Sequence, residues 1–291
     1  MSEAPPVGLE RRWVRAAFER ASAAYESGAQ LQAEVGAQLL SRLEDFPLAP
    51  RVVLDLGAGT GRLTRALRRR YPAALTIALD LAPGMLRVAG RRQGWWRRFA
   101  RVCGDAQRLP LADASVDLVF SNLMLPWCDP AAAFAEVQRV LRPQGLLAFS
   151  TLGPQTLAEL RAAWAAADRF SHVHRFADVQ EVGMALMRSR LAEPVLDVDR
   201  LRRTTPDACA LMRGLKSLGA HNVSAGRPRS LLGRTRLERV RQAYEALRGP
   251  DGLPVTYEII YGVSWGSAAR AALAHEAQVA VASIRRAGPR R

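Results

Sequence analysis

The segment that most constrains the fold is a short apolar run followed by three alternating glycines. Residues 52–56 read Val-Val-Leu-Asp-Leu, a composition typical of a buried parallel strand. Gly57, Gly59 and Gly61 follow at every second position. Glycine permits sharp backbone turns and leaves room for a ligand where a Cβ would collide with it. The segment therefore predicts a strand that turns abruptly into a helix beside a bound molecule.

The glycine spacing and two later acids indicate what that molecule is. Arg62 occupies the position after Gly61, so the loop is G-x-G-x-G rather than the dinucleotide pattern, and it lacks the Lys-Ser/Thr ending of a P-loop. Asp80 ends a second predicted strand, where an acid can accept hydrogen bonds from two ribose hydroxyls. Asp105 follows a third strand and could accept from an adenine amino group. A nucleoside site is the favoured interpretation, and a glycine-rich turn with surface acids is the alternative.

The first half of the chain alternates between strands and helices, which predicts a doubly wound parallel sheet. A helical cap is predicted at 1–50 and an α/β core at 51–153, followed by a helical lid with late strands at 154–265 and a basic tail at 266–291. In the core we predict strands at 52–56, 75–79, 100–103, 116–120 and 146–150, and helices at 63–70, 83–89 and 131–141. Beyond these we predict helices near 155–168, 178–190, 206–218 and 235–247, with edge strands at 195–201 and 255–263.

Composition excludes several classes of protein. The chain is 49% hydrophobic and 24% charged, so it can bury a sizeable core. The longest uncharged stretch, residues 143–158, is too short and too polar for a membrane span, and the N-terminus lacks a signal pattern. Three widely separated cysteines fit a reducing cytoplasm. A net charge of +15 predicts attraction to an acidic partner, which composition alone does not identify.

The loop and its acids together resemble the S-adenosylmethionine site of class I methyltransferases. The resemblance implies an α/β, Rossmann-like sheet of seven strands with an N-terminal helical cap and a helical lid insertion. It also implies S-adenosylmethionine as the cofactor. The positions that match its binding residues are Asp55, Gly57, Gly59, Gly61, Asp80, Leu81, Met85, Asp105, Ala106 and Asn122.

Segments outside the cofactor core resemble a narrower family, the malonyl-acyl-carrier-protein O-methyltransferases of biotin synthesis. The similarity covers roughly residues 12–265 and includes residues 17–25, 31–32, 121–123, 127–128, 141–143, 149–152, 175–176, 215–222, 226–228 and 252–257. It implies methyl transfer to the free carboxylate of a malonyl thioester carried by an acidic protein. Residues 121–128 lack the Pro-Pro-aromatic motif of base-modifying methyltransferases, so nucleic acid is not an expected partner. A membrane is not expected as a partner either.

A malonyl carboxylate is already ionised at neutral pH, so methylation requires no general base. It does require a donor that faces the carboxylate when water is removed. We predict Tyr25 and Arg175 for this role; the alternatives are a core aromatic and a solvated arginine. Tyr25 matches a tyrosine that the family places near the methyl group, although Ala24 stands where a histidine is often found.

Other features have more ordinary interpretations. Residues 87–101 hold six arginines with Trp95 and Trp96, and form either a solvated loop or a docking patch for the acidic carrier. His172 and His174 lack neighbouring ligands, so no metal is expected, and Cys128 is expected to pack beneath the site. The arginines predicted for carrier docking by analogy with the family are Arg188, Arg190, Arg202, Arg203, Arg213, Arg227 and Arg229.

Two alternative functions remain open from the sequence. The lid segments also resemble the methyltransferase-fold assembly factor of respiratory complex I, which hydroxylates an arginine of a partner subunit. A nucleoside-binding scaffold with a basic surface, acting in assembly or RNA contact, is the alternative outside enzymes.

Overall fold

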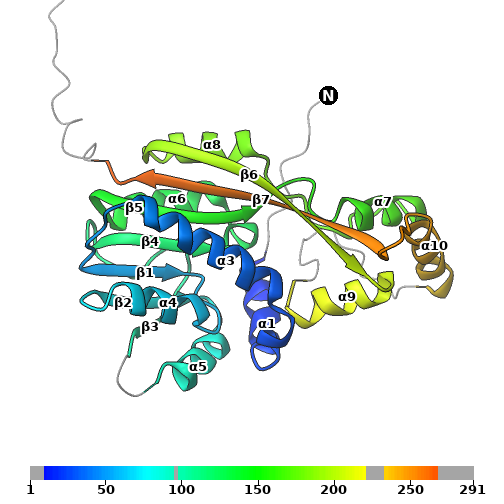
Figure 1. Ribbon diagram of the computed structural model, residues 1–291, viewed down its shortest axis with the longest axis horizontal. Coiled ribbons are helices and arrows are strands. Elements are labelled where there is room, and N and C mark those ends of the chain that lie inside the picture. Colours follow the sequence, from blue (N-terminus) through cyan, green and yellow to red (C-terminus); the bar gives the residue numbers. More distant parts are fainter. Residues whose placement is uncertain (1–9, 95–97, 221–232, 268–291) are drawn as a thin grey trace, which may run out of the picture.

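The computed structural model describes residues 10–94, 98–220 and 233–267. Within these residues the strands form one seven-stranded sheet in the order β3-β2-β1-β4-β5-β7-β6 (Figure 1). The predicted features at Trp95, Trp96, residues 221–222 and 226–229, and the tail from residue 268 onward lie outside the described residues. The strands are β1 (Val52–Leu56), β2 (Leu75–Asp80), β3 (Ala100–Cys103), β4 (Val116–Asn122), β5 (Leu141–Leu152), β6 (Ala192–Thr205) and β7 (Leu253–Trp265).

The first five strands of the sheet run parallel, as the sequence predicts. β1 pairs in parallel with both β2 and β4, and β2 pairs in parallel with β3. Each strand is therefore followed by a loop at the same edge of the sheet. The carboxyl ends at Leu56, Asp80, Cys103 and Asn122 meet there, which brings the glycine loop and both predicted acids together.

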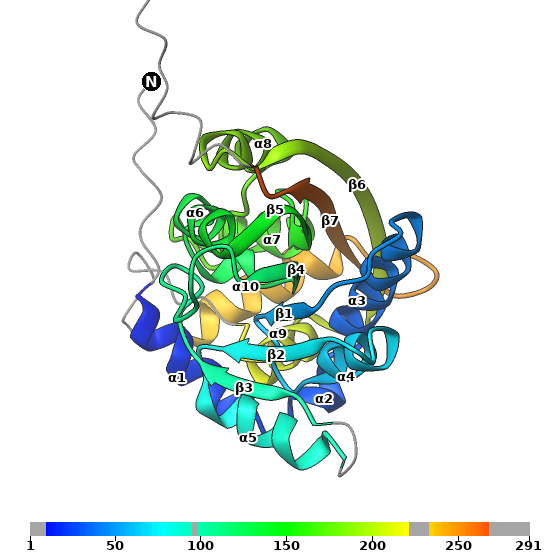
Figure 2. The ribbon, with the colours of Figure 1, turned by 90° about the vertical axis from the view of Figure 1, so that its left-hand side faces the viewer.

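Helices cover both faces of the sheet (Figure 2). On one face, Val35 and Leu39 of α3 (Gln30–Arg42) and Leu67 of α4 (Arg62–Arg70) pack on the strands. The other face is covered by α6 (Pro130–Val140) and α8 (Val179–Arg188). α8 was predicted within the lid, but its apolar residues Val182 and Leu186 are buried against the sheet. No helix of the described residues is long and apolar enough to cross a membrane.

The N-terminal cap is a broken helix. α1 (Arg11–Ala21), the single turn α2 (Tyr25–Gly28) and α3 follow one another, with α2 and α3 separated by Ala29. α1 lies against α5 (Pro83–Arg92), so the cap passes over the carboxyl edge of the sheet.

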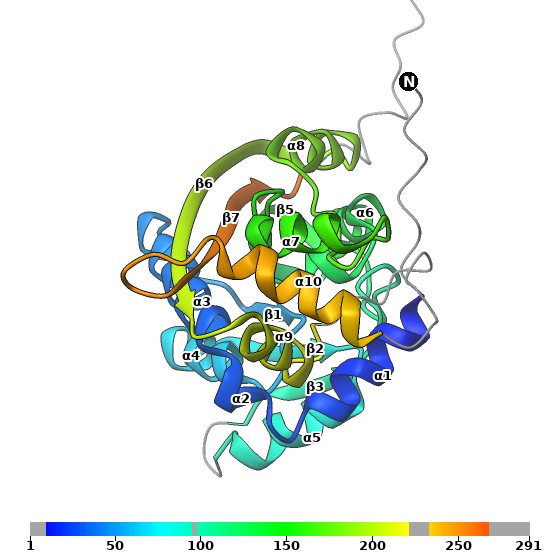
Figure 3. The same cartoon turned by 90° about the vertical axis from the view of Figure 1, so that its right-hand side faces the viewer.

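The late strands are longer than the sequence predicts. β7 lies antiparallel between β5 and β6, and its pairing with β5 ends where Leu152 faces Ile259. Its pairing with β6 continues to Thr205 and Leu253. The two-stranded extension leaves the sheet and carries α7 (Ala158–Ala167), α9 (Ala208–Ser217) and α10 (Arg234–Glu245) (Figures 1 and 3). We call these three helices and the strand extension the lid.

One boundary within the core differs from the prediction. Residues 142–145 were expected to end a helix, but they form the first part of β5. The register shifts between Val116 and Leu118, and Gln144 has a φ of 64°. An irregular strand start of this kind contains the proline and glycine that the sequence pattern assigned to a turn.

Candidate active site

The three glycines of the loop after β1 serve different purposes. All have positive φ, at 78° for Gly57, 53° for Gly59 and 75° for Gly61. A Cβ on Gly57 would lie 2.5 Å from Met124 Cγ, and one on Gly61 would lie 2.9 Å from the Cβ of Ala89. Gly57 and Gly61 therefore have no room for a side chain, because neighbouring elements pack closely against them. A Cβ on Gly59 would meet nothing within 4 Å, so Gly59 borders open space.

Asp80 ties the glycine loop to the end of β2. Its carboxylate accepts hydrogen bonds from the backbone N–H of Gly59 at 2.8 Å and from that of Ala82 at 2.8 Å. Burial raises the pKa of Asp80, and those backbone donors act in the opposite direction. A carboxylate has about four acceptor sites, so two hydroxyl groups of a ligand can still be bound.

A cavity of about 640 Å³ opens beside the loop. One part of its wall comes from the loops that follow β1 to β4, and another from the lid. The predicted site residues on this wall are Tyr25, Gly57, Gly59, Asp80, Leu81, Met85, Asp105, Ala106 and Asn122. Residues from five separate segments of the sequence therefore meet at one space.

Two predicted cofactor residues, Asp55 and Gly61, are not among the residues lining this wall. Asp55 is 1% exposed and accepts a hydrogen bond from the Thr64 hydroxyl at 2.5 Å. Burial, and then the charge of Asp80, raises its pKa to about 7. Because it lies beneath the loop, Asp55 fixes the start of α4, while Gly61 allows α4 to approach α5.

Asp105 and Asn122 complete the polar part of the wall. The Asp105 carboxylate accepts from the backbone N–H of Gln107 at 2.9 Å and pairs with the guanidinium of Arg11 at 2.7 Å. The Asn122 amide donates to the carbonyl of Gln32 at 2.9 Å and accepts from the Ser150 hydroxyl at 2.8 Å.

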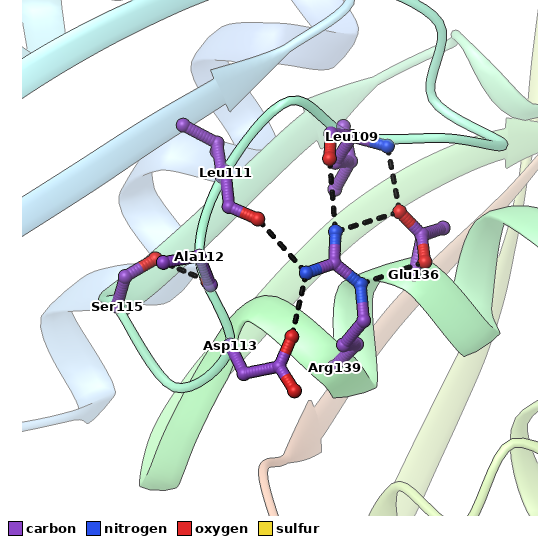
Figure 4. Close-up of polar contacts among 7 residues, drawn as sticks. All are labelled: Leu109, Leu111, Ala112, Asp113, Ser115, Glu136 and Arg139. Carbon is purple, nitrogen blue, oxygen red and sulfur yellow. Dashed lines mark hydrogen bonds and ion pairs between the residues drawn. The ribbon is translucent and has the colours of Figure 1, made fainter.

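The loop carrying Asp105 is anchored by one arginine of α6 (Figure 4). Arg139 donates to the carbonyls of Leu109 at 2.9 Å and Leu111 at 2.8 Å, and it pairs with Asp113 at 2.7 Å. It also makes a forked contact with Glu136, both bonds being 2.8 Å. Hydrogen bonding to Arg139 is the main reason that the pKa of Glu136 is lowered. The forked geometry fixes the path of the loop below the cavity.

The wall fits an adenosine-containing cofactor on three observations. Gly59 leaves space next to the loop, and Asp80 and Asp105 offer acceptors on neighbouring loops. In addition, Gln32 lines the cavity and its side-chain oxygen is buried without a hydrogen-bond partner among the described residues. A buried acceptor of this kind is costly unless a ligand donor or a water reaches it.

Tyr25 and Arg175 are not brought together. Tyr25 lines the cavity, and burial followed by the charges of Asp80 and Glu26 raises its pKa, so its hydroxyl is a neutral donor. Arg175 is 60% exposed and pairs with Glu181 at 2.8 Å. His174 and Phe176 on either side of it line the cavity, but Arg175 is not among the lining residues.

Contacts from the cap reach each of the three cofactor loops. Glu26 hydrogen-bonds the Thr60 hydroxyl and pairs with Arg62 in the first. Glu19 accepts from the backbone N–H of Gly84 at 2.5 Å after β2, and Arg11 pairs with Asp105 after β3. These contacts hold Tyr25 over the cavity.

Two cations that the sequence analysis did not place in the site come from the lid. Arg203, at the end of β6, lines the cavity and pairs with Glu34 of α3. Lys216, near the end of α9, also lines it. Arg203 was considered only for carrier docking and Lys216 only as part of a similar segment. Of the 42 Lys and Arg residues in the chain Lys216 is the single lysine, and that rarity was the signal available.

The remaining predicted features have structural roles. His172 stacks on Trp164 with ring centroids 3.7 Å apart and hydrogen-bonds Asp168 at 2.9 Å. Across the described part of the chain no group of three His, Cys, Asp or Glu could hold a metal. Trp127 packs edge-on against Phe18, and burial raises the pKa of the Cys128 thiol to about 12. A buried thiol of that kind is not an activated nucleophile.

Comparison with known proteins shows what this chain is similar to. A family model described as "Methyltransferase domain" matches residues 54–149. The protein named malonyl-[acyl-carrier protein] O-methyltransferase in Laribacter hongkongensis is 49% identical over 266 residues, covering 88% of this chain and 90% of that protein. The protein of the same name in Methylovorus sp. is 47% identical over 273 residues, covering 91% and 92%.

Solved structures show the same fold. A putative methyltransferase from Bacillus halodurans superposes with a TM-score of 0.57 at 16% identity, covering 80% of this chain and 98% of that one. The YcgJ protein of Bacillus subtilis superposes with a TM-score of 0.55 at 20% identity, covering 79% and 98%.

Proposed function

The chain belongs to the malonyl-[acyl-carrier protein] O-methyltransferase family, and from that membership we propose that it methylates the free carboxylate of a malonyl thioester. The methyl donor would be S-adenosylmethionine and the acceptor malonyl-acyl-carrier protein. The methyl ester would disguise the acyl chain so that fatty-acid enzymes elongate it, which begins pimeloyl synthesis for biotin.

The observation that carries this proposal is the charge distribution of the cavity. Asp80 and Asp105 lie on the wall formed by the loops after β2 and β3, and the lid contributes Arg203 and Lys216. Asp105 is paired with Arg11, which also lines the cavity, and Arg203 is paired with Glu34. Asp80 and Lys216 are therefore the lining charges without an ion pair among the described residues. None of the described lining residues from the lid is an Asp or Glu. A cationic donor is therefore favoured on the acidic side and an anionic acceptor on the lid side.

The residues that would hold the cofactor follow from this arrangement. Asp80 would accept from the ribose hydroxyls, Asp105 from the adenine amino group, and Leu81 and Met85 would provide apolar contacts. S-adenosylmethionine supplies an electrophilic methyl group on a sulfonium. The space at Gly59 permits close approach of the adenosine to the backbone.

The protein would then catalyse transfer by alignment and exclusion of water. An ionised carboxylate is a sufficient nucleophile, so the residues need only hold it in line with the methyl group. The Tyr25 hydroxyl, kept neutral by burial, would donate a hydrogen bond to the carboxylate. The lid lines its part of the cavity with Leu157, Leu160, Trp164 and Leu211, which displace water from the carboxylate.

This proposal is favoured over the hydroxylase-like assembly factor and the nucleoside-binding scaffold. Similarity to the O-methyltransferases covers about nine-tenths of the chain, including the lid. The described cysteines Cys103, Cys128 and Cys209 are free thiols, which supports placing the reaction in the cytoplasm.

The proposal is tested with methyl-labelled S-adenosylmethionine and malonyl-acyl-carrier protein. We expect the label to appear on the acyl group as a base-labile ester, and acetyl-acyl-carrier protein to remain unlabelled. Absence of transfer, or a label that resists base, would refute the proposed reaction. Hydroxylation of an arginine in a partner protein would support the assembly-factor alternative.

A further inference from the structure

The strongest unexplained feature of the cavity is Lys216. Of 42 Lys and Arg residues in the chain this is the single lysine, so arginine serves at every other cationic position. An ammonium differs from a guanidinium because it is compact and can direct its three donors to one point. A position that keeps lysine in such a chain is one where the shape of the cation matters.

Helix α9 places Lys216 in the wall of the cavity, where its side chain is exposed. Leu211, Met212, Leu215 and Leu218 line the same wall, and Lys216 follows Met212 by four residues, so it lies in the same row of the helix. Arg213 and Ser217, on the remaining surface of the helix, do not line the cavity. Lys216 is therefore an exposed charged group that borders the apolar face of α9.

The Lys216 ammonium has no counterion within the described residues. Arg203, the other lid cation, is paired with Glu34, and Arg11 is paired with Asp105. Neither a hydrogen bond nor an ion pair connects the Lys216 side chain to a described residue. An anion that enters the lid side of the cavity would meet an unpaired cation there.

The end of α9 also contacts the cap that carries Tyr25. A Cβ on Gly28 would lie 3.2 Å from Leu218 Cδ2 and 3.6 Å from the Ser217 hydroxyl. A Cβ on Gly219 would lie 3.1 Å from the carbonyl of Ala17. The end of α9 that carries Lys216 is thus packed against the cap that carries Tyr25.

We propose that Lys216 binds the carboxylate of the acceptor and so selects malonyl over uncharged acyl thioesters. This inference rests on the proposed function, because it assigns a residue to the acceptor of that reaction. The ammonium would pair with one carboxylate oxygen and leave the other to attack the methyl group.

Kinetics with a small malonyl thioester test the assignment without carrier docking. Lys216→Ala should lower kcat/KM about 10- to 100-fold, the range for a lost charge-assisted hydrogen bond, while cofactor affinity stays unchanged. Lys216→Arg should recover only part of this loss. Arg241→Ala, which removes an exposed cation of α10 paired with Glu238, is the matched control and should behave as wild type.

Chemical labelling of the wild-type protein provides a second test that does not depend on any variant folding. Lysine acetylation can modify only Lys216 and the chain's α-amino group, which serves as an internal reference. With S-adenosylhomocysteine present to prevent turnover, a malonyl thioester should slow acetylation of Lys216. The matching acetyl thioester and 4′-phosphopantetheine should not.

The outcomes separate this inference from the function on which it rests. Equal protection by the acetyl thioester, or protection by the phosphate compound instead, would overturn the carboxylate assignment. A wild-type kcat/KM in the Lys216→Ala variant would also overturn the carboxylate assignment. The proposed reaction would still stand if the wild-type protein forms the methyl ester. If the wild type forms no ester yet the malonyl thioester alone protects Lys216, the carboxylate site stands and the proposed reaction fails.

Discussion

Asp55 and Asp80 are acids at neighbouring strand ends, and their surroundings give them different partners. Asp80 reaches the cavity with its carboxylate held by two backbone N–H groups. Asp55 lies one layer deeper and holds the Thr64 hydroxyl. The identity and spacing of both acids are visible in the sequence. Which of them faces the ligand depends on the alternation of side chains along the strand, which the folded sheet fixes.

Replacement of Asp80 tests its part in cofactor binding. Asp80→Ala removes the acceptors expected for the ribose, so calorimetry should show affinity for S-adenosylmethionine weakened by about 10- to 100-fold or more. Asp129→Ala, at the exposed N-cap of α6, is the control and should leave that affinity unchanged. Unchanged affinity in Asp80→Ala would exclude the ribose role.

Tyr25 is expected to act on turnover rather than on cofactor binding. Tyr25→Phe keeps the ring and removes the hydroxyl donor, so kcat should fall on the order of tenfold to hundredfold while the cofactor Kd changes little. Tyr71→Phe changes a tyrosine that does not line the cavity and is the control. Wild-type kcat in Tyr25→Phe would remove its hydroxyl from the reaction.

At the scale of elements, the sequence predicted the positions of the parallel strands because β1, β2 and β4 are short apolar runs between glycines, prolines or acids. It underestimated β6, whose burial pattern is mostly exposed or intermediate because it is the edge strand. It also predicted Arg175 in the site. In the structure Arg175 pairs with Glu181 in the first turn of α8 and is not among the residues lining the cavity, and no local pattern reveals that pairing.

The Arg139 anchor is expected to stabilise the fold and the Asp105 loop together. Arg139→Ala leaves two carbonyls and two carboxylates without this donor, so the free energy of unfolding should fall by about 2–4 kcal/mol. Arg69→Ala, on α4, is the control, because no side-chain hydrogen bond or ion pair of Arg69 is found within the described residues. A loss below about 0.5 kcal/mol in denaturant unfolding would contradict the anchor.

The same anchor predicts a pH dependence. The pKa of Glu136 in the folded protein is lowered from 4.5, so its stabilising contribution is present above that value and is lost as pH falls through the folded pKa. The wild-type protein should therefore lose more stability than Arg139→Ala between neutral pH and acid below pH 4.5. If the free energy of unfolding falls equally in the two proteins as the pH is lowered, the Glu136 carboxylate contributes nothing to stability.

For the whole molecule, we expect the net charge of +15 to favour association with the proposed acidic carrier. Screening shortens the reach of these charges to about 10 Å at 0.1 M salt. Added salt should raise the KM for malonyl-acyl-carrier protein more than the KM for a small malonyl thioester. Equal sensitivity of the two KM values would argue against an electrostatic docking surface.

The central claim is that the cavity separates a cationic donor from an anionic acceptor, and a crystal structure tests it most directly. The complex should contain S-adenosylhomocysteine and a small malonyl thioester. We predict the ribose on Asp80 and the carboxylate on the lid side, within reach of Lys216. Absence of S-adenosylhomocysteine from the glycine loop, or a malonyl carboxylate bound beside Asp80 and Asp105, would contradict the account.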